Sequence, residues 1–374
     1  MNYQEFEDEV KKLYYMEHDP DILKLVAGII VGNRLDSMPI WAMLVAPSGG
    51  GKSAIVEIFD KTEWVVRVSS LTPASFASGK TSSCPVLDLV KEKKTLLVSD
   101  FSTLFSAPKD IKEEIMSFLR ESYGGKFTRV TGNLAKPVEW EGKYGLIGCI
   151  TPHGADVAVD ENASLGERFF LIRLRVTPES DEKIMEAAYD KAFARSVNDG
   201  ALKQYAIDFI QYMDKNIPDN ATIQSKLPLD FDPFVKSCAK ALAWARSPVH
   251  RDRTTKEIDF SSRYGRESPG RLVGQLSALA GGLAAIGCTQ DDIRRIIKRV
   301  TVEALPHKRG RALACIAQKM NKQDEFSMSM GVSRSTIERT MEDLEELGLI
   351  KSSNKFSWIF IDPIYEEIFG EYAL

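Results

Sequence analysis

The sequence predicts an α/β fold, followed by a mostly helical region and a small C-terminal module. Three observations predict this class. Between Met38 and about Val176, short apolar segments alternate with helical segments, as in a sheet covered by helices. A glycine-rich loop that contains a lysine and a serine joins the first of these apolar segments to a helix. From Pro178 onward, the apolar residues recur mostly with helical spacing.

These patterns divide the chain into four predicted segments. Residues 1–37 form an N-terminal helical segment with an acidic surface, and residues 38–177 form the α/β core. Residues 178–302 form a helical lid, and residues 303–374 form a helix-turn-helix module. The strands predicted for the core are Trp41–Val45, Trp64–Val68, Thr95–Val98, Tyr144–Ile150 and Phe169–Leu174.

Composition places the chain among ordinary soluble proteins. Of its 374 residues, 44% are hydrophobic and 27% are charged, which is typical of a globular protein of two or three domains. The formal net charge of −4 means that any affinity for nucleic acid must come from a local group of cations. The five cysteines stand singly, which predicts a reducing cytoplasm and no zinc site. Without a signal-peptide pattern or a long apolar run, we expect no association with a membrane.

The glycine-rich loop has the pattern of a phosphate-binding loop. It reads Ala46-Pro47-Ser48-Gly49-Gly50-Gly51-Lys52-Ser53 and lies between the strand Trp41–Val45 and an apolar-periodic helix. The three glycines allow backbone N–H groups to surround an anion at the start of the helix. Lys52 would reach the β- and γ-phosphates, and Ser53 would bind Mg²⁺. The alternative is a flexible glycine-rich turn. We predict that the loop binds ATP with Mg²⁺.

An acidic residue follows the strand Thr95–Val98, in the segment KTLLVSDFST. Asp100 stands at the tip of that strand and is the predicted Mg²⁺ ligand. Many ATPases have a glutamate next to this aspartate to polarise the attacking water. Here the neighbours are Ser99 and Phe101, so the water-activating base is not identified. The alternative for Asp100 is a solvated residue at a strand end.

Three further residues are candidates for contact with the γ-phosphate. Thr151 ends the strand in YGLIGCITPHG, where its hydroxyl would orient the phosphate or the water, or would simply be a strand threonine. Arg168, in ASLGERFFLIRL, follows a bend and is a candidate arginine finger inserted into the site of a neighbouring subunit. Arg271, in the first turn of a lid helix, would touch phosphate or be a surface arginine.

A hairpin is predicted in GGKFTRVTGNLAKPVEWEGK. Residues Lys126–Val130 and Val138–Trp140 have strand character and flank a turn. Lys126, Arg129 and Lys136 lie on or near this hairpin, where they would bind a polyanion or would be ordinary solvated charges.

The C-terminal module reads as a winged helix-turn-helix. We predict a first helix at Leu313–Met320, a turn at Gly331–Ser333 and a second helix at Arg334–Leu347 that Gly348 ends. Two strands around Ser353-Asn354-Lys355 form the wing. The region 331–374 has four basic and nine acidic residues, whereas 294–322 has nine basic and one acidic. DNA contact is therefore predicted through the basic stretch, the start of the second helix and Lys355; the alternative is docking of a protein.

Together, APSGGGKS, LLVSDFS, VEWEGKYGLIGCITP, SLGERFFLIRL and ESPGRLVGQL resemble motifs of AAA+ ATPases of phages, prophages and mobile elements. The resemblance extends from about Trp41 to Leu283. It points to the pre-sensor hairpin group, which includes superfamily 3 and minichromosome-maintenance helicases. The resemblance implies a hexameric or similar ring with ATP sites between subunits. Lys52, Ser53, Asp100 and Thr151 would act within one subunit, Arg168 as a finger in the next, and Arg271 as a sensor in the lid.

The function predicted from these features is a ring-forming AAA+ ATPase that translocates on or unwinds DNA during replication of a phage or mobile element. Its partners would be single-stranded DNA in the pore and a replication protein on the winged helix. One alternative is an ATP-dependent helicase loader or DNA-bound regulatory switch. Another is a protein-remodelling machine, for which Tyr123 and Phe127 would supply an aromatic grip. The predicted location is the cytoplasm.

Overall fold

The structure is a computed structural model. It describes residues 1–77, 83–130, 137–155, 168–175, 178–190, 195–252, 255, 257–259, 265–320, 322–354 and 357–370. The chain forms two compact units, each built from several stretches of sequence. The first comprises Met1–Asp160, Leu171–Leu227 and Ala278–Ile293. The second comprises Glu161–Phe170, Pro228–Ser277 and Arg294–Leu374.

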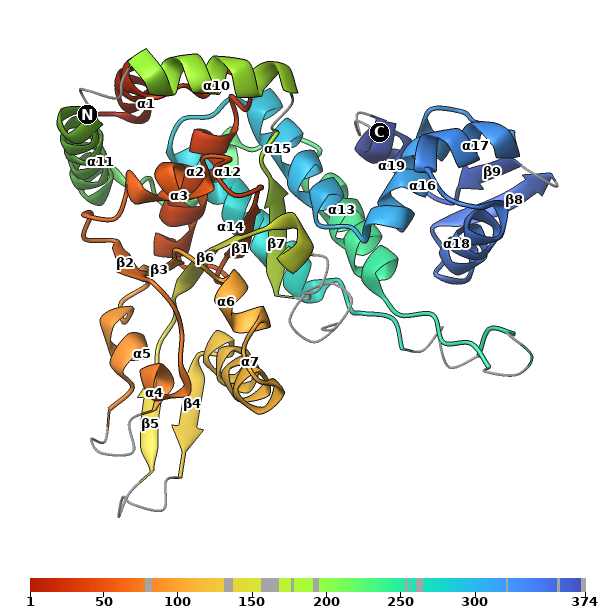
Figure 1. Ribbon diagram of the computed structural model, residues 1–374, viewed down its shortest axis with the longest axis horizontal. Coiled ribbons are helices and arrows are strands. Elements are labelled where there is room, and N and C mark those ends of the chain that lie inside the picture. The colour runs from red at the N-terminus through yellow and green to blue at the C-terminus, as the bar shows by residue number, and fades with distance from the viewer. Residues whose placement is uncertain are drawn as a thin grey trace. The chain divides into compact units, whose positions relative to one another are not determined.

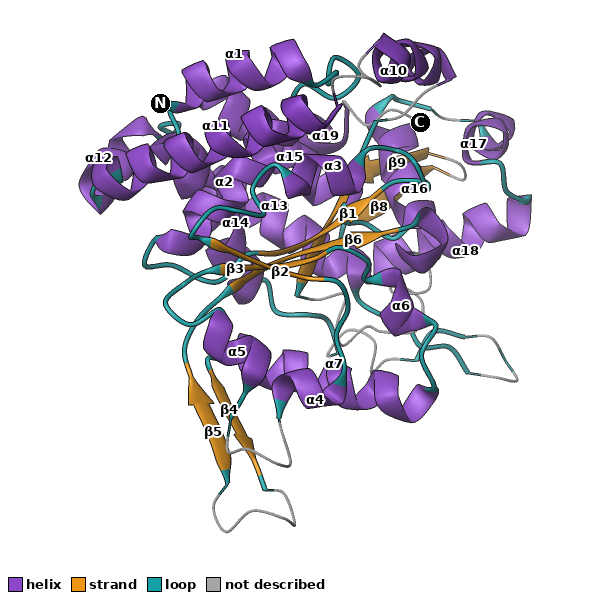
Figure 2. Ribbon diagram, turned by 60° about the vertical axis from the view of Figure 1, so that its left-hand side comes forward, coloured by secondary structure: helices purple, strands orange, loops and turns teal. Residues whose placement is uncertain are grey.

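A five-stranded sheet forms the centre of the first unit (Figures 1 and 2). Its strands have the order β2-β3-β6-β1-β7. The pairs β2–β3, β3–β6 and β6–β1 are parallel. The bounds are β1 (Trp41–Val45), β2 (Val65–Val68), β3 (Thr95–Val98), β6 (Gly145–Ile150) and β7 (Phe169–Arg173). These strands confirm the α/β class predicted from the sequence. The apolar runs of the three central strands, β3, β6 and β1, are fully buried, as expected for a sheet covered on both faces.

Short and medium helices connect these strands and surround them. They are α1 (Tyr3–Leu13), α2 (Ile22–Arg34), α3 (Lys52–Glu57), α4 (Pro73–Phe76), α5 (Pro85–Leu89), α6 (Ser102–Phe105), α7 (Lys109–Tyr123), α10 (Pro178–Asp190), α11 (Arg195–Asn216) and α12 (Asn220–Lys226). Helix α1 begins with a capping box, in which Asn2 and Glu5 satisfy each other's backbone N–H groups. Among the described helices, none combines the length and the apolar character needed to cross a bilayer.

Glycines allow α2 to pack closely against the end of α14 (Gly270–Ala285). A Cβ atom on Gly282 would lie 2.0 Å from the Gly28 carbonyl oxygen and 2.7 Å from the Gly32 nitrogen. A Cβ on Gly32 would in turn lie 2.7 Å from the Ala278 carbonyl oxygen. The two helix backbones therefore contact each other directly, with no room for side chains at these positions.

The second unit contains the C-terminal module. Its elements are α13 (Phe231–Arg246), α15 (Gln290–Glu303), α16 (His307–Ala317), α17 (Gln323–Met330), α18 (Arg334–Glu346), β8 (Ile350–Asn354), β9 (Ser357–Phe360) and α19 (Ile364–Gly370), and α15 begins in the first unit. Helix α18 buries Ile337, Met341 and Leu344 against its neighbours. Strands β8 and β9 form an antiparallel hairpin (Figure 1).

One sequence prediction for the second unit is wrong. The predicted helix Leu313–Met320 is the end of α16, which stops at Ala317, and a separate helix, α17, precedes the turn at Gly331. Helix α17 buries Phe326 and Met330 but exposes Met328, and its other residues are polar, so helical periodicity is weak there. The ends of α18 agree with the prediction, since Ser333 occupies the N-cap and Gly348 has a left-handed φ of +77°.

Arginines among the described residues of 246–271 form ion pairs within the second unit. Arg246 ends α13, and its guanidinium pairs with Glu267 at 2.9 Å. Arg251, whose side chain is only 12% exposed, pairs with Asp343 at 2.7 Å and with Glu342 at 3.0 Å. These arginines are therefore internal links of the second unit, because their carboxylate partners come from segments distant in sequence.

Candidate functional site

The loop between β1 and α3 follows a fully buried strand. Gly49 and Gly51 have φ angles of +82° and +79°, in the left-handed region that favours glycine. Gly51 is the N-cap of α3, and the Gly50 N–H donates to the Pro47 carbonyl at 3.0 Å. Nothing lies within 4 Å of the position that a Cβ on Gly49 would occupy. The loop thus turns tightly and leaves open space beside Gly49.

Two side chains contact the loop backbone. The Lys52 Nζ donates to the Pro47 carbonyl at 3.1 Å, so the ammonium group lies across the loop. The Tyr14 hydroxyl, just beyond the end of α1, lies 3.4 Å from the Gly51 carbonyl, to which it donates. Burial raises the pKa of Tyr14 to about 12, which keeps the phenol protonated as a donor. Sequence reasoning missed Tyr14, because its contact with Gly51 spans 37 residues.

Thr151 follows β6, which lies next to β1 in the sheet, and Asp100 follows β3, which lies on the other side of β6. Parallel pairing brings the carboxyl ends of β1, β6 and β3 to one edge, with Val45 opposite Ile150 and Val98 opposite Gly148. Backbone contacts connect the segments there: the Thr151 N–H donates to the Ser102 hydroxyl at 3.3 Å. This edge is where open parallel sheets usually bind ligands.

Cys149, in β6, is a buried thiol near the carboxyl edge of the sheet. Burial raises the pKa of Cys149 in β6 to about 12, while the charge of Lys52 and a hydrogen bond with Ser53 act in the opposite direction. Glu57 and Asp100 add to the increase. The predicted binding of phosphate and Mg²⁺ by Lys52, Ser53 and Asp100 stays a prediction.

The local hydrogen bonds of Asp100 and Thr151 are compatible with ligand binding. The exposed Asp100 carboxylate accepts from the Ser102 N–H at 3.0 Å through one oxygen. Thr151 Oγ1 accepts from the Gly154 N–H at 3.3 Å. Within the described residues, no group of three or more His, Cys, Asp or Glu side chains is placed to hold a metal. One carboxylate and one hydroxyl suit Mg²⁺, which keeps several waters and takes other ligands from a bound phosphate.

Arg67 is a second residue that sequence reasoning missed. From β2, its guanidinium donates to Glu57 at 2.6 Å, to Asp60 at 3.1 Å and to the Ser99 hydroxyl at 2.9 Å. Arg67 thus connects α3 to the residue immediately before Asp100. The only sequence signal was a single arginine in an otherwise apolar strand.

Arg168 and Arg271 belong to the second unit. The Arg168 carbonyl accepts from Gln275 Nε2 at 2.9 Å. Arg271 Nη2 lies 3.3 Å from Glu267, which also pairs with Arg246. Their predicted roles toward a γ-phosphate stay predictions, because they depend on how the units and subunits assemble.

The predicted hairpin consists of β4 (Lys126–Arg129) and β5 (Val138–Glu141), which pair antiparallel. Lys126 Nζ lies 3.8 Å from Glu141 across the pair. Arg129 pairs with Glu114, and its guanidinium lies 4.4 Å from the Phe118 ring centroid. Both cations therefore already have anionic partners, whereas Lys136 lies outside the described residues. Tyr123 and Phe127, only 9% and 1% exposed, belong to the core at the base of this hairpin.

The basic stretch 294–322 is also largely neutralised within the second unit. Arg294 pairs with Asp230 at 2.9 Å and with Glu367 at 2.7 Å, and these contacts raise its pKa. Arg309 pairs with Asp343 at 3.1 Å, and Lys319 pairs with Glu366. Lys355 of the predicted wing lies outside the described residues. Arg294, Arg309 and Lys319 of the basic stretch therefore already have anionic partners.

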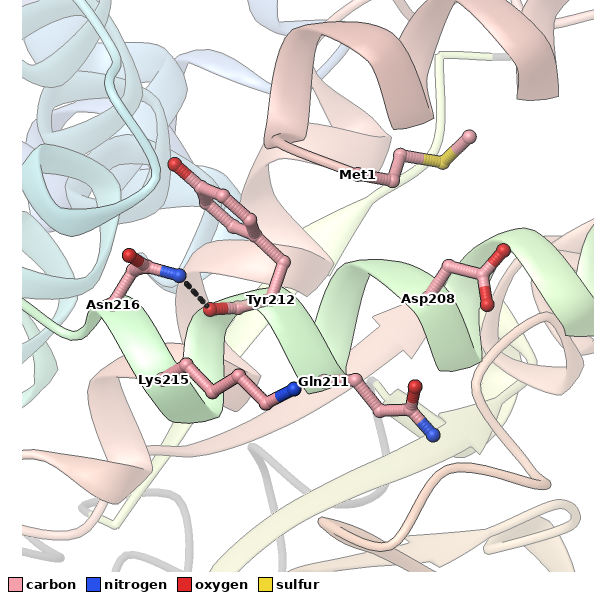
Figure 3. A pocket seen from close by; sticks show the side chains of 6 residues that line it. All are labelled: Met1, Asp208, Gln211, Tyr212, Lys215 and Asn216. Carbon is pink, nitrogen blue, oxygen red and sulfur yellow. Dashed lines mark hydrogen bonds between the residues drawn. The ribbon is translucent and has the colours of Figure 1, made fainter.

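A polar depression of about 340 Å³ lies elsewhere in the first unit (Figure 3). It is lined by Met1 and by Asp208, Gln211, Tyr212, Lys215 and Asn216 of α11. Asn216 Nδ2 donates to the Tyr212 carbonyl at 2.7 Å, an ordinary contact within one helix. These residues include no nucleophile–base pair, so we assign the depression no chemistry.

Comparison with known proteins adds no family to this description. No protein-family model matches the chain, and no curated protein matches it significantly by sequence.

Proposed function

We propose that this protein is an ATPase of the AAA+ kind, which binds ATP and Mg²⁺ at the β1–α3 loop. The observation that supports it most is the left-handed geometry of Gly49 and Gly51 directly before Lys52, at the sheet edge that also carries Asp100 and Thr151. A phosphate-binding loop requires glycines, a lysine, a hydroxyl and an acidic residue on a neighbouring strand end. In this proposal, Lys52 neutralises phosphate charge, and Ser53 and Asp100 hold Mg²⁺.

We further propose that the ATPase forms a ring that moves along or unwinds DNA in the replication of a phage or mobile element. Its support is the sequence resemblance, together with a hairpin that projects from the sheet (Figure 2). In this proposal, the C-terminal module with α17, α18 and the β8–β9 hairpin is a winged helix. The acidic residues of α18 favour docking of a replication protein there over reading of DNA.

A helicase loader or regulatory switch is the second candidate. The pairing of Lys126 with Glu141 and of Arg129 with Glu114 favours it, because a motor must grip DNA strongly through its pore. The protein-remodelling alternative loses its support, because the aromatic rings of Tyr123 and Phe127 are buried.

The test of the nucleotide site is the Lys52→Ala variant, with Lys61→Ala as the matched control. Lys61 is an exposed lysine soon after the same helix. Lys52→Ala should weaken ATP binding and abolish ATP turnover, whereas Lys61→Ala should behave like the wild type. Turnover that persists in Lys52→Ala would refute the site. An ATP-driven strand-displacement assay with the wild type then separates a motor, which unwinds a fork, from a switch, which hydrolyses ATP without unwinding.

A further inference from the structure

A group of cations lies at the edge of the sheet opposite the β1–α3 loop. We call Arg34, Lys93 and Lys143 the basal cluster. Lys93 and Lys143 each stand two residues before a central strand, β3 and β6, so they lie at the amino ends of these strands. The Lys93 N–H donates to the Lys143 carbonyl at 3.1 Å. Lys143 also follows Glu141, the end of β5, by two residues, which places the cluster at the base of the β4–β5 hairpin (Figure 2).

The backbone that carries Lys93 is strained. Glu92 and Lys93 have φ angles of +71° and +63°, a left-handed conformation that side chains other than glycine rarely adopt. Two contacts maintain it: the Lys143 carbonyl accepts from Lys93, and Arg34 Nη1 donates to the Glu92 carbonyl at 2.6 Å. Arg34 is fixed in turn, 4.9 Å from the centroid of the Trp64 ring. Strain that the surroundings maintain in this way is a pointer to function.

The cations of the basal cluster are close together and poorly neutralised by the described residues around them. Lys143 Nζ is half-buried and lies 3.4 Å from the Leu35 carbonyl. Burial and the neighbouring charge of Lys93 lower the pKa of Lys143 to about 8. Asp36 lies 3.5 Å from Lys93, but its side chain is 89% exposed. An ion pair so exposed to water contributes little and exchanges readily for another anion.

We infer that the basal cluster binds the phosphate backbone of a nucleic acid strand that passes the base of the hairpin. The inference rests on the proposed action on nucleic acid, and it adds a contact at the base of the hairpin to those predicted for Lys126 and Arg129. Phosphate oxygens accept from both lysine and arginine, and the contact would relieve the repulsion between Lys93 and Lys143. Such a contact positions a strand without reading its sequence.

The test measures binding of fluorescent single-stranded DNA at several salt concentrations. The test variant combines Lys93→Asn with Lys143→Gln, since asparagine tolerates the left-handed conformation and glutamine keeps a donor for Leu35. Lys109→Gln is the control: this lysine is 84% exposed and begins α7, at the end of that helix remote from the hairpin. A double variant with Lys93→Arg and Lys143→Arg keeps both charges.

Two lost phosphate contacts should reduce the slope of log K against log salt by about 1.4, and should weaken binding roughly ten- to thirtyfold at 0.1 M salt. The control and the arginine variant should keep the wild-type slope. ATP affinity should be unchanged in all of them, and a cooperative thermal transition of each variant shows that it is folded.

If the wild type binds DNA and the test variant has the same slope of log K against log salt, the inference is overturned and the proposed function stays intact. A wild type that binds neither DNA nor RNA at low salt would overturn both. If the wild type binds polyglutamate but no nucleic acid, and the same substitutions abolish that binding, the partner of the basal cluster would instead be an acidic protein.

Discussion

Asp100 holds one backbone N–H through one carboxylate oxygen and exposes the rest of the group to solvent. The Asp100→Asn change keeps this contact, because an amide oxygen accepts the same bond from Ser102. It removes the charge that Mg²⁺ needs. We expect ATP binding to persist while Mg²⁺-dependent hydrolysis falls on the order of 10²-fold.

Steady-state turnover and nucleotide titration with and without Mg²⁺ measure the two effects separately. Asp110→Asn, an exposed aspartate in the first turn of α7, is the control. Hydrolysis that Asp100→Asn leaves unchanged would assign the metal to another residue.

Lys143 predicts a pH effect on stability. Its pKa of about 8 in the folded protein lies below the value of about 10.4 expected in the unfolded chain. Between these values, the unfolded chain binds more protons, so the folded state gains stability from this group as pH rises. The charges that act on Lys143 are those of Lys93 and Asp36.

Urea unfolding of the wild type and of Lys143→Met at pH 7.5 and pH 9.5 isolates this contribution. The free energy of unfolding of the wild type should increase relative to that of the variant as pH rises. If the free energy of unfolding of the wild type, relative to that of the variant, stays constant or falls as pH rises, the lowered pKa of Lys143 is contradicted.

The residues that sequence reasoning found and missed differ in how far their partners lie along the chain. Gly49, Gly51 and Lys52 were predictable because their roles depend on neighbours within one loop. Tyr14 and Arg67 were not, because their contacts span 37 and 32 residues. Arg129 was identified as a hairpin residue, but its pairing with Glu114 depends on how α7 packs, which local sequence does not show.

At the scale of elements, the strands were predicted closely because each is a short apolar run bounded by polar residues. Helix α17 was missed because only part of its short length is apolar. The close approach of α14 to α2 was not predicted, since it depends on glycines meeting across two helices that lie far apart in sequence.

Gly282→Ala tests that approach, and its neighbour supplies the control. A methyl group on Gly282 would overlap backbone atoms of α2, whereas one on Gly281 would meet only the side chains of Leu35 at 3.1 Å and Ile223 at 3.6 Å. Both changes gain the same helix propensity, about 1 kcal/mol. We expect Gly281→Ala to leave the free energy of unfolding unchanged or to increase it. Gly282→Ala should lower the free energy of unfolding by roughly 1–3 kcal/mol or more, because the added methyl group overpacks the contact between the helices.

Chemical denaturation followed by circular dichroism gives both values. Equal stability of the two variants would show that α2 and α14 can separate without cost.

At the scale of the whole molecule, the decisive question is assembly, since a net charge of −4 and paired cations leave long-range attraction to DNA weak. Arg168 is the proposed link between subunits. If Arg168 reaches a neighbour's γ-phosphate, the Arg168→Ala protein should bind ATP normally. Its rate of ATP hydrolysis should fall on the order of 10²-fold or more.

Mixing Arg168→Ala with Lys52→Ala subunits tests the arrangement directly. One interface of a mixed ring joins an intact loop to an intact arginine, so two inactive proteins should regain part of the activity. Mixed assemblies that form, as mass measurement can establish, but remain inactive would exclude a role in a neighbouring site.

The order of strands in the sheet also has a consequence for biosynthesis. Strand β1, which leads into the glycine-rich loop, lies between β6 and β7, and Trp41 pairs with Leu146. On the ribosome, β1 therefore emerges roughly a hundred residues before its first hydrogen-bonded neighbour exists. Until then, a strongly apolar segment has no sheet to join and is open to aggregation or to chaperones. The loop that is proposed to hold ATP is thus synthesised early, but its surroundings are complete only after β6 has paired with β1.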